Sequence, residues 1–194
     1  MSKKNFAEAI HPDDKRLKDP HLAVFIVSTE EGPRVPLIGR NKALKNADGS
    51  PLLDDQNKPI VEIWYDLPGG KSDPILQHNK IIGVESGALA AQRETGEETG
   101  LFVSVGDKIG ENSHPARPGL TRHFYGATHE GGKFDNKVPD EHLFVFMADP
   151  ENAISLLGER IPNEVQDYIR TESAKISMQQ IKPETSRMML AIAS

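Results

Sequence analysis

ESGALAAQRETGEETGL, residues 85–101, contains the most informative pattern of this sequence. It predicts a helix that begins after Ser86, because a serine hydroxyl can accept a bond from an unpaired first-turn amide. Gly100 suits the left-handed position just past the end of a helix. Residues three and four apart share one face of a helix, so Glu94, Glu97 and Glu98 project together. Their like charges repel, and a helix of this sequence needs cations to compensate them.

Two sources of compensating charge are open. Arg93 could bridge out to one of the glutamates, or a divalent cation could be coordinated by several of them. Magnesium is a hard ion that takes oxygen ligands at about 2.1 Å and usually keeps waters and phosphate oxygens in its octahedron. A solvated acidic face is the ordinary interpretation of paired glutamates. Gly96 favours a functional stretch instead, because a glycine inside a helix costs about 1 kcal/mol relative to alanine.

The segment resembles the Nudix box, a pattern of glycine, glutamate, Arg-Glu, Glu-Glu and a final glycine at fixed spacing. The residues that match it are Glu85, Arg93, Glu94, Glu97, Glu98, Gly100 and Leu101. Two positions depart from the pattern: Thr95 replaces an apolar residue, and Asn79 stands where the first glycine belongs. A Leu-Pro-Gly-Gly-Lys approach to the box is present at residues 67–71, so we interpret residues 72–84 as a surface loop that includes an insertion of nine residues.

Apolar and β-branched runs predict the strands of the domain. They lie at residues 22–28, 35–40, 60–66, 102–105, 123–129 and 142–148, and residues 81–84 form a short apolar segment before the helix. Residues 41–59 are expected to form a surface loop or a loose hairpin, and helices are expected at 151–160 and after Pro162. This order predicts an α/β or α+β layered domain, and the resemblance implies a Nudix-type mixed β-sheet sandwiched between helices. A length of 194 residues suggests one domain over residues 1–194, with a core at about 20–150 and C-terminal helices at about 150–180.

The resemblance also implies the roles of the site residues. The expected metal ligands are Gly70, through its carbonyl, with Glu94, Glu97 and Glu98. Glu97 is in addition a candidate for the group that activates water. Arg93 would act catalytically by holding the carboxylates in ligating orientation, and Glu85 would orient Arg93. The implied cofactor is Mg²⁺, with Mn²⁺ as an alternative.

The implied reaction is attack of water on one phosphorus of a P–O–P bridge. Bound magnesium would stabilise the developing charge and lower the pKa of the attacking water. Family members often draw the general base from a loop outside the helix. Glu141 is the preferred candidate here and Glu130 the second, although Glu141 could equally cap a strand at the surface.

The substrate is expected to be a small nucleotide. Residues 114–119, HPARPG, are similar in place and in Pro-Gly content to a loop of ADP-ribose pyrophosphatases, which favours ADP-ribose or a nucleotide sugar. Dinucleoside polyphosphates and (d)NTPs are alternatives. Arg117 and Arg122 could bind phosphates, and Phe124 or Tyr125 could stack on a base, although such arginines are often solvated and such aromatics often belong to the core.

A non-catalytic nucleotide-binding Nudix module is the alternative from another class of protein. Such modules usually lose one or more box glutamates, whereas this sequence keeps all of them. Related ADP-ribose enzymes are often dimers, which makes a homodimer possible.

Composition narrows the partners and the compartment. A net charge of −6 argues against binding to nucleic acid or anionic membranes, which would be repelled at long range. The sequence contains 0 cysteines, which removes disulfides, thiolate metal sites and a cysteine nucleophile. The N-terminus has no apolar segment typical of a secretory signal, so a cytoplasmic location is expected.

Overall fold

The structure is a computed structural model that describes residues 10–137 and 144–192. Its strands are β1 (Pro20–Val24), β2 (Val27–Thr29), β3 (Gly32–Ala43), β4 (Val61–Asp66), β5 (Gly69–Lys71), β6 (Pro74–Gln77), β7 (Lys80–Val84), β8 (Leu101–Ser113), β9 (Thr121–Gly132) and β10 (Phe144–Ala148). Its helices are α1 (Gly87–Thr99), α2 (Pro150–Leu157) and α3 (Asn163–Ile192), with short 3-10 turns η1 (Lys15–Leu17) and η2 (Gly158–Arg160). None of the helices in these ranges is long and apolar enough to cross a membrane.

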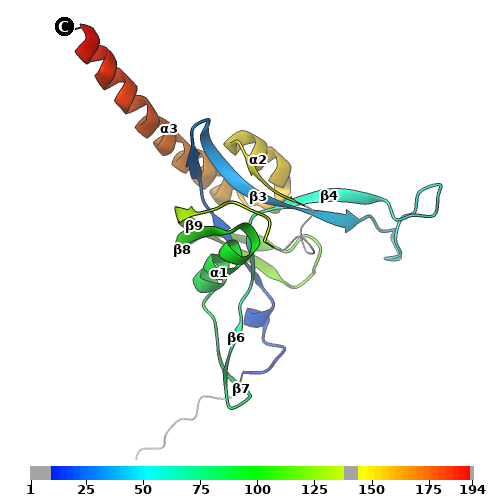
Figure 1. Cartoon of the computed structure of the whole chain (residues 1–194). Coiled ribbons are helices and arrows are strands. Elements are labelled where there is room, and N and C mark those ends of the chain that lie inside the picture. Colours follow the sequence, from blue (N-terminus) through cyan, green and yellow to red (C-terminus); the bar gives the residue numbers. More distant parts are fainter. Residues whose placement is uncertain (1–9, 138–143, 193–194) are drawn as a thin grey trace, which may run out of the picture.

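The strands form two larger sheets and one separate hairpin (Figure 1). The first sheet has the order β5-β1-β9-β8, in which β1 and β9 are parallel and the other pairs antiparallel. In the second sheet the long strand β3 pairs antiparallel with β10, β2 and β4. Helix α1 packs on β8, β5 and β1, whereas α2 and α3 pack against β3. The predicted α/β fold, a mixed sheet between helices, is therefore confirmed.

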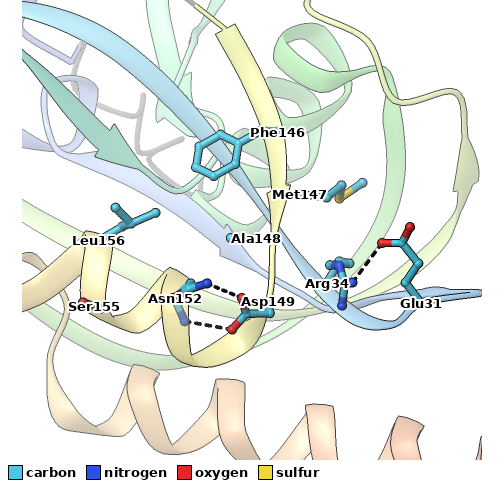
Figure 2. Close-up of a pocket in the computed structure, with 9 residues that line it drawn as sticks. All are labelled: Glu31, Arg34, Phe146, Met147, Ala148, Asp149, Asn152, Ser155 and Leu156. Atoms are coloured by element: carbon cyan, nitrogen blue, oxygen red, sulfur yellow. Dashed lines mark hydrogen bonds and ion pairs between the residues drawn. The ribbon is translucent and has the colours of Figure 1, made fainter.

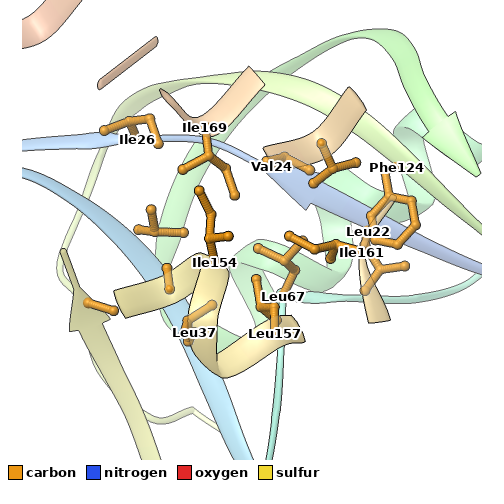
Figure 3. Packing of buried hydrophobic residues seen from close by; sticks show 14 residues of the cluster. Leu22, Val24, Ile26, Leu37, Leu67, Phe124, Ile154, Leu157, Ile161 and Ile169 are labelled. Atoms are coloured by element: carbon orange, nitrogen blue, oxygen red, sulfur yellow. The ribbon is translucent and has the colours of Figure 1, made fainter. Parts of the chain in front are cut away.

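The run at residues 22–28 supplies both halves of the core because alternate side chains of a strand point to opposite faces. Leu22 and Val24 face α2 and α3 in a large cluster that includes Phe124 and Ile169 (Figure 3). Ala23 belongs instead to the cluster on the α1 side. This run was expected to be one strand, and that expectation is wrong: it divides into β1 and β2, which pair in different sheets. A continuous apolar run contains no periodicity that would mark such a break.

Two hairpins project from the body in Figure 1. The first continues β3 and β4 outward through isolated bridges at Lys45–Pro51 and Leu53–Pro59, which agrees with the expected loose hairpin. The second is formed by β6 and β7, where a surface loop was expected. The loop prediction is wrong because His78 and Asn79 adopt φ angles of 49° and 60°, and two successive positive values are typical of a tight hairpin turn.

Candidate functional site

Helix α1 has the ends and the packing that the sequence predicts. The Ser86 hydroxyl accepts from the amide of Leu89 at 3.3 Å, and Gly100 ends the helix with a φ of 72°. Ala90 and Ala91 lie on the inner face of the helix and are fully buried. Thr95, the departure from the box pattern, is buried too, but its hydroxyl donates to the Ala91 carbonyl at 2.7 Å. The extra hydroxyl is therefore satisfied within the helix.

Arg93 is the hub of the acidic face. Its guanidinium contacts Glu85 at 2.9 Å, Glu94 at 2.9 Å and Glu97 at 3.1 Å. It also donates to the Lys71 carbonyl at 2.9 Å, which ties the helix to the end of β5. Burial disfavours the charged form of Glu85, but hydrogen bonds from Arg93 and from the backbone lower the pKa of Glu85 overall. Arg93 therefore gathers three carboxylates that would otherwise repel each other.

Glu98 is held by a second arginine, on another element. Its side chain is only 5% exposed and accepts from Arg40 of β3 at 2.9 Å and from the Gly69 amide at 2.8 Å. Arg40 is not predicted from the sequence, because nothing local to residue 40 indicates that β3 passes the end of α1. Glu98 is thus fixed between the box helix, β3 and the start of β5.

Gly70 lies directly against Glu94. A Cβ atom added at Gly70 would collide with the Glu94 carboxylate, so this close approach requires glycine. Burial raises the pKa of Glu94, and the nearby Glu98 and Glu97 raise it further, while Arg93 opposes them. The fold brings Gly70 and Glu94 together although fourteen residues separate Gly70 from Glu85, the first matching residue of the box.

Gly70, Glu94 and Glu98 border one cleft of about 320 Å³. Of the expected site residues it is lined by Gly70, Glu94, Glu98, Arg117 and Arg122, and it is further lined by Arg40, Asp66 and His114, among others. Glu97 lies outside this lining, with its side chain 56% exposed. Glu130, the second candidate for the general base, is exposed on β9 and does not line the cleft. Glu141, the first candidate, lies outside the described residues.

The donor set of the cleft fits a divalent cation in its chemistry. Two carboxylates and a backbone carbonyl are oxygen ligands, which magnesium and manganese accept. Among the side chains described, those of residues 10–137 and 144–180, no group of three acidic or histidine residues is arranged to hold a metal as it stands. The arginines explain this arrangement, since Arg93 engages Glu94 while Arg40 engages Glu98. Each carboxylate has two oxygens with several lone pairs, so Glu94 and Glu98 could bind a cation while they keep these arginine contacts.

The residues expected to bind substrate differ in their surroundings. Arg122 lines the cleft, but its side chain is only 2% exposed, pairs with Asp66 and donates to the Arg160 carbonyl at 2.7 Å. Phe124 is fully buried in the core, so the expectation that it stacks on a base is wrong. Tyr125 packs in the cluster on the α1 side and does not line the cleft.

A larger cavity, of about 590 Å³, lies beside β10 and α2 (Figure 2). None of the expected site residues lines it. Its polar groups satisfy one another, since Arg34 pairs with Glu31 at 3.0 Å and Asp149 caps α2 through the Asn152 amide at 3.0 Å. The cleft over the box helix is therefore the better candidate site.

Comparison with known proteins supports the fold. No protein-family model matches the chain, and no curated protein matches it by sequence. Among solved structures, a C. elegans Ap4A hydrolase is 16% identical, with 82% of this chain and 98% of that chain covered and a TM-score of 0.51. A NUDIX hydrolase from Nitrosomonas europaea is 18% identical, with 82% and 90% covered and a TM-score of 0.47. An ADP-ribose pyrophosphatase from Streptococcus suis is 20% identical, with 70% and 75% covered and a TM-score of 0.42.

The chain has a Nudix-type α/β fold. The Ap4A hydrolase is similar over nearly its whole length, and at 16% identity this similarity shows the fold alone.

Proposed function

We propose that this chain is a Nudix pyrophosphohydrolase, which uses a divalent cation to cleave the P–O–P bridge of a nucleoside diphosphate linked to another group. The observation that supports this most is that Gly70 of β5 and Glu94 and Glu98 of the box helix line one cleft. A merely solvated acidic face would not place Glu98 in a side-chain environment only 5% exposed. The proposed cofactor is Mg²⁺, with Mn²⁺ as an alternative.

Separate sets of residues would bind the metal and the substrate. Gly70, Glu94 and Glu98 would hold the metal, with Glu97 as a further ligand or as the group that activates water. When bound, the cation stabilises negative charge on the phosphates and lowers the pKa of water. Arg93 orients the carboxylates through its contacts with Glu94 and Glu97.

The cationic wall of the cleft would bind the phosphates of the substrate. Arg40 and Arg117 line it together with the more deeply buried Arg122. Arg122 is fixed by Asp66, so its charge would act on a phosphate from a set position rather than by moving out to meet it. The role of general base stays with Glu141 as a prediction.

ADP-ribose or a nucleotide sugar is the proposed substrate. The segment at residues 114–119, which is similar to a loop of ADP-ribose pyrophosphatases, contributes His114 and Arg117 to the cleft. Dinucleoside polyphosphates are the second candidate, since the solved structure with a TM-score of 0.51 is that of an Ap4A hydrolase. A silent nucleotide-binding module is the remaining alternative.

A substrate screen tests the proposal. ADP-ribose, nucleotide sugars, dinucleoside polyphosphates and (d)NTPs would be incubated with Mg²⁺, with Mn²⁺ and with a chelator, and the products identified by chromatography. We expect metal-dependent release of a nucleoside monophosphate, which Glu98→Gln reduces by at least about a hundredfold, since a metal ligand contributes several kcal/mol to the transition state. Glu151→Gln, an exposed site far from the box in sequence, is the matched control. Nucleotide binding without cleavage of any compound would instead identify a silent module.

A further inference from the structure

A second cavity, of about 200 Å³, adjoins the cleft and is lined by an aromatic ring instead of glutamates. The two share part of their lining, namely Arg40, Asp66, His114, Arg117 and Arg122. The second cavity adds Asn41, Lys42, Trp64, Pro115 and Ala116, and no glutamate lines it. Three arginines therefore line both cavities, whereas Glu94 and Glu98 line only the first and Trp64 lines only the second.

The register of β3 and β4 gathers the aromatic end. Arg40 lies opposite Trp64, and Lys42 lies opposite Glu62. Directly opposed residues project to the same face of a sheet, as do residues two apart along a strand. Arg40, Lys42 and Trp64 therefore occupy one face. The neighbouring Tyr65 points to the other face, where its ring contacts Phe144 and Phe146.

Trp64 is not packed as a core residue. It belongs to neither of the two hydrophobic clusters. The Lys42 ammonium lies 3.3 Å from the centre of its ring, and the Arg160 guanidinium lies 5.5 Å from it. Its indole Nε1 is buried without a hydrogen-bond partner within the described part of the chain. The Lys42 side chain is 38% exposed and would have to move aside for a base to stack on this face of the ring.

We propose that Trp64 is the stacking platform for the base of the nucleotide substrate, which enters the second cavity while its phosphates extend toward Glu94 and Glu98. This inference rests on the proposed function and names the part of the site that recognises the nucleoside. Stacking on an aromatic ring accepts any base, because every base has a π-face. The arginines shared by both cavities lie between the ring and the carboxylates, where a diphosphate would need cations.

The loop at residues 114–117 also lines this cavity. Pro115 and Ala116 supply apolar lining, while Arg117 faces both cavities. Burial lowers the pKa of His114, and the positive charges of Arg122 and Arg117 lower it further. A neutral imidazole at this position can exchange hydrogen bonds with a base or a ribose without adding charge.

The single tryptophan of the chain makes a direct binding test possible, because all indole fluorescence comes from Trp64. The wild-type protein would be titrated in chelator with AMP, ADP-ribose, ribose 5-phosphate and pyrophosphate, with a free tryptophan derivative as the control for light absorbed by the nucleotides. We expect saturable quenching by AMP and ADP-ribose, and no comparable change with ribose 5-phosphate or pyrophosphate. Equal responses to all of them, or no response to the two nucleotides, would overturn the proposal.

Substitutions separate this subsite from catalysis. We expect Trp64→Leu to weaken AMP binding in calorimetry about 5- to 150-fold, the range measured when a stacking ring is lost, and Trp64→Phe to restore most of it. Far-ultraviolet circular dichroism checks that both variants fold. If wild-type protein hydrolyses the substrate but Trp64→Leu and Trp64→Phe bind AMP as wild type does, the platform is wrong and the proposed function stands. If nucleotides quench Trp64 and no compound is hydrolysed, the platform stands and the proposed function is wrong.

Discussion

Replacing Arg93 tests whether the box helix is assembled around one cation. The Arg93 side chain is 25% exposed, while Glu85 and Glu94 are 17% and 22% exposed, so these two ion pairs are largely shielded from solvent. Hydrogen bonds to charged groups contribute about 1.5–3 kcal/mol each when buried, and exposed pairs about 0.2–1 kcal/mol. We take about 1–1.5 kcal/mol for each shielded pair and less than about 0.5 kcal/mol for Glu97, which is 56% exposed. Arg93→Ala is therefore expected to lower the free energy of unfolding by about 3 kcal/mol.

Two further variants make this magnitude interpretable. Arg93→Lys keeps the charge but not the fork of donors, so we expect a loss of about 1–2 kcal/mol. Arg170→Ala removes an arginine that contacts Glu151 at 3.0 Å, with the two side chains 46% and 68% exposed. That pair is a surface salt bridge, and its loss should cost less than about 1 kcal/mol.

The assay is urea unfolding followed by circular dichroism, in chelator and again in magnesium. The dependence on urea should stay the same in all variants, so that a shift of the midpoint reports stability. Added magnesium should widen the difference in stability between wild type and Arg93→Ala, because the variant loses the residue that orients the metal ligands, binds the cation more weakly and gains less stability by mass action. If Arg93→Ala in chelator loses no more stability than Arg170→Ala, Arg93 is not the hub of this site.

Three other outcomes are expected. Gly70→Ala should weaken Mg²⁺ or Mn²⁺ binding in calorimetry by at least about tenfold, since its Cβ would collide with Glu94, whereas Gly106→Ala, with its nearest neighbour atom at 3.5 Å, should not. Glu98→Gln should retain the wild-type circular dichroism spectrum but lose metal-dependent turnover; full activity in this variant would remove Glu98 from the mechanism. Burial lowers the pKa of His21 to about 4, below its ordinary 6.5, so stability present above pH 6.5 should fall by up to about 3 kcal/mol as the pH drops toward 4. His21→Gln should flatten this dependence in urea midpoints measured across that range.

The parts of the site that the sequence predicts are local to the box helix. Ser86 and Gly100 end the helix where expected, and Arg93 bridges to glutamates within one or two turns. Helix geometry alone brings such residues together, so spacing is sufficient to place them. The Arg40 contact with Glu98 spans 58 positions, and it depends on the route of β3 past α1. No local pattern encodes that route.

The difference between local and long-range contacts also explains why the positions of the aromatic residues were not predicted. Phe124 lies two places from Arg122, so it shares the face of β9 that carries a cleft residue. Toward the middle of the sheet, however, this face is covered by α2 and α3, and Phe124 is buried in their cluster. Trp64 was passed over because it lies in an apolar run that predicts only a strand. Its place beside the cleft follows from its pairing with Arg40, which is a property of the sheet register.

The insertion between Gly70 and Glu85 shows why a long interruption can leave a site intact. A hairpin leaves the body and returns to it at nearly the same point, so its length need not alter the positions of its two ends. Here the ends are fastened directly: the Glu85 amide donates to the Asp73 carbonyl at 2.9 Å, and the Asp73 amide donates to the Glu85 carboxylate at 3.1 Å. Arg93 completes the closure, because it contacts both Glu85 and the Lys71 carbonyl at 2.9 Å. Glu85 therefore closes the base of the inserted hairpin while it positions Arg93. The insertion separates Gly70 from the box in sequence, but it does not separate them in space.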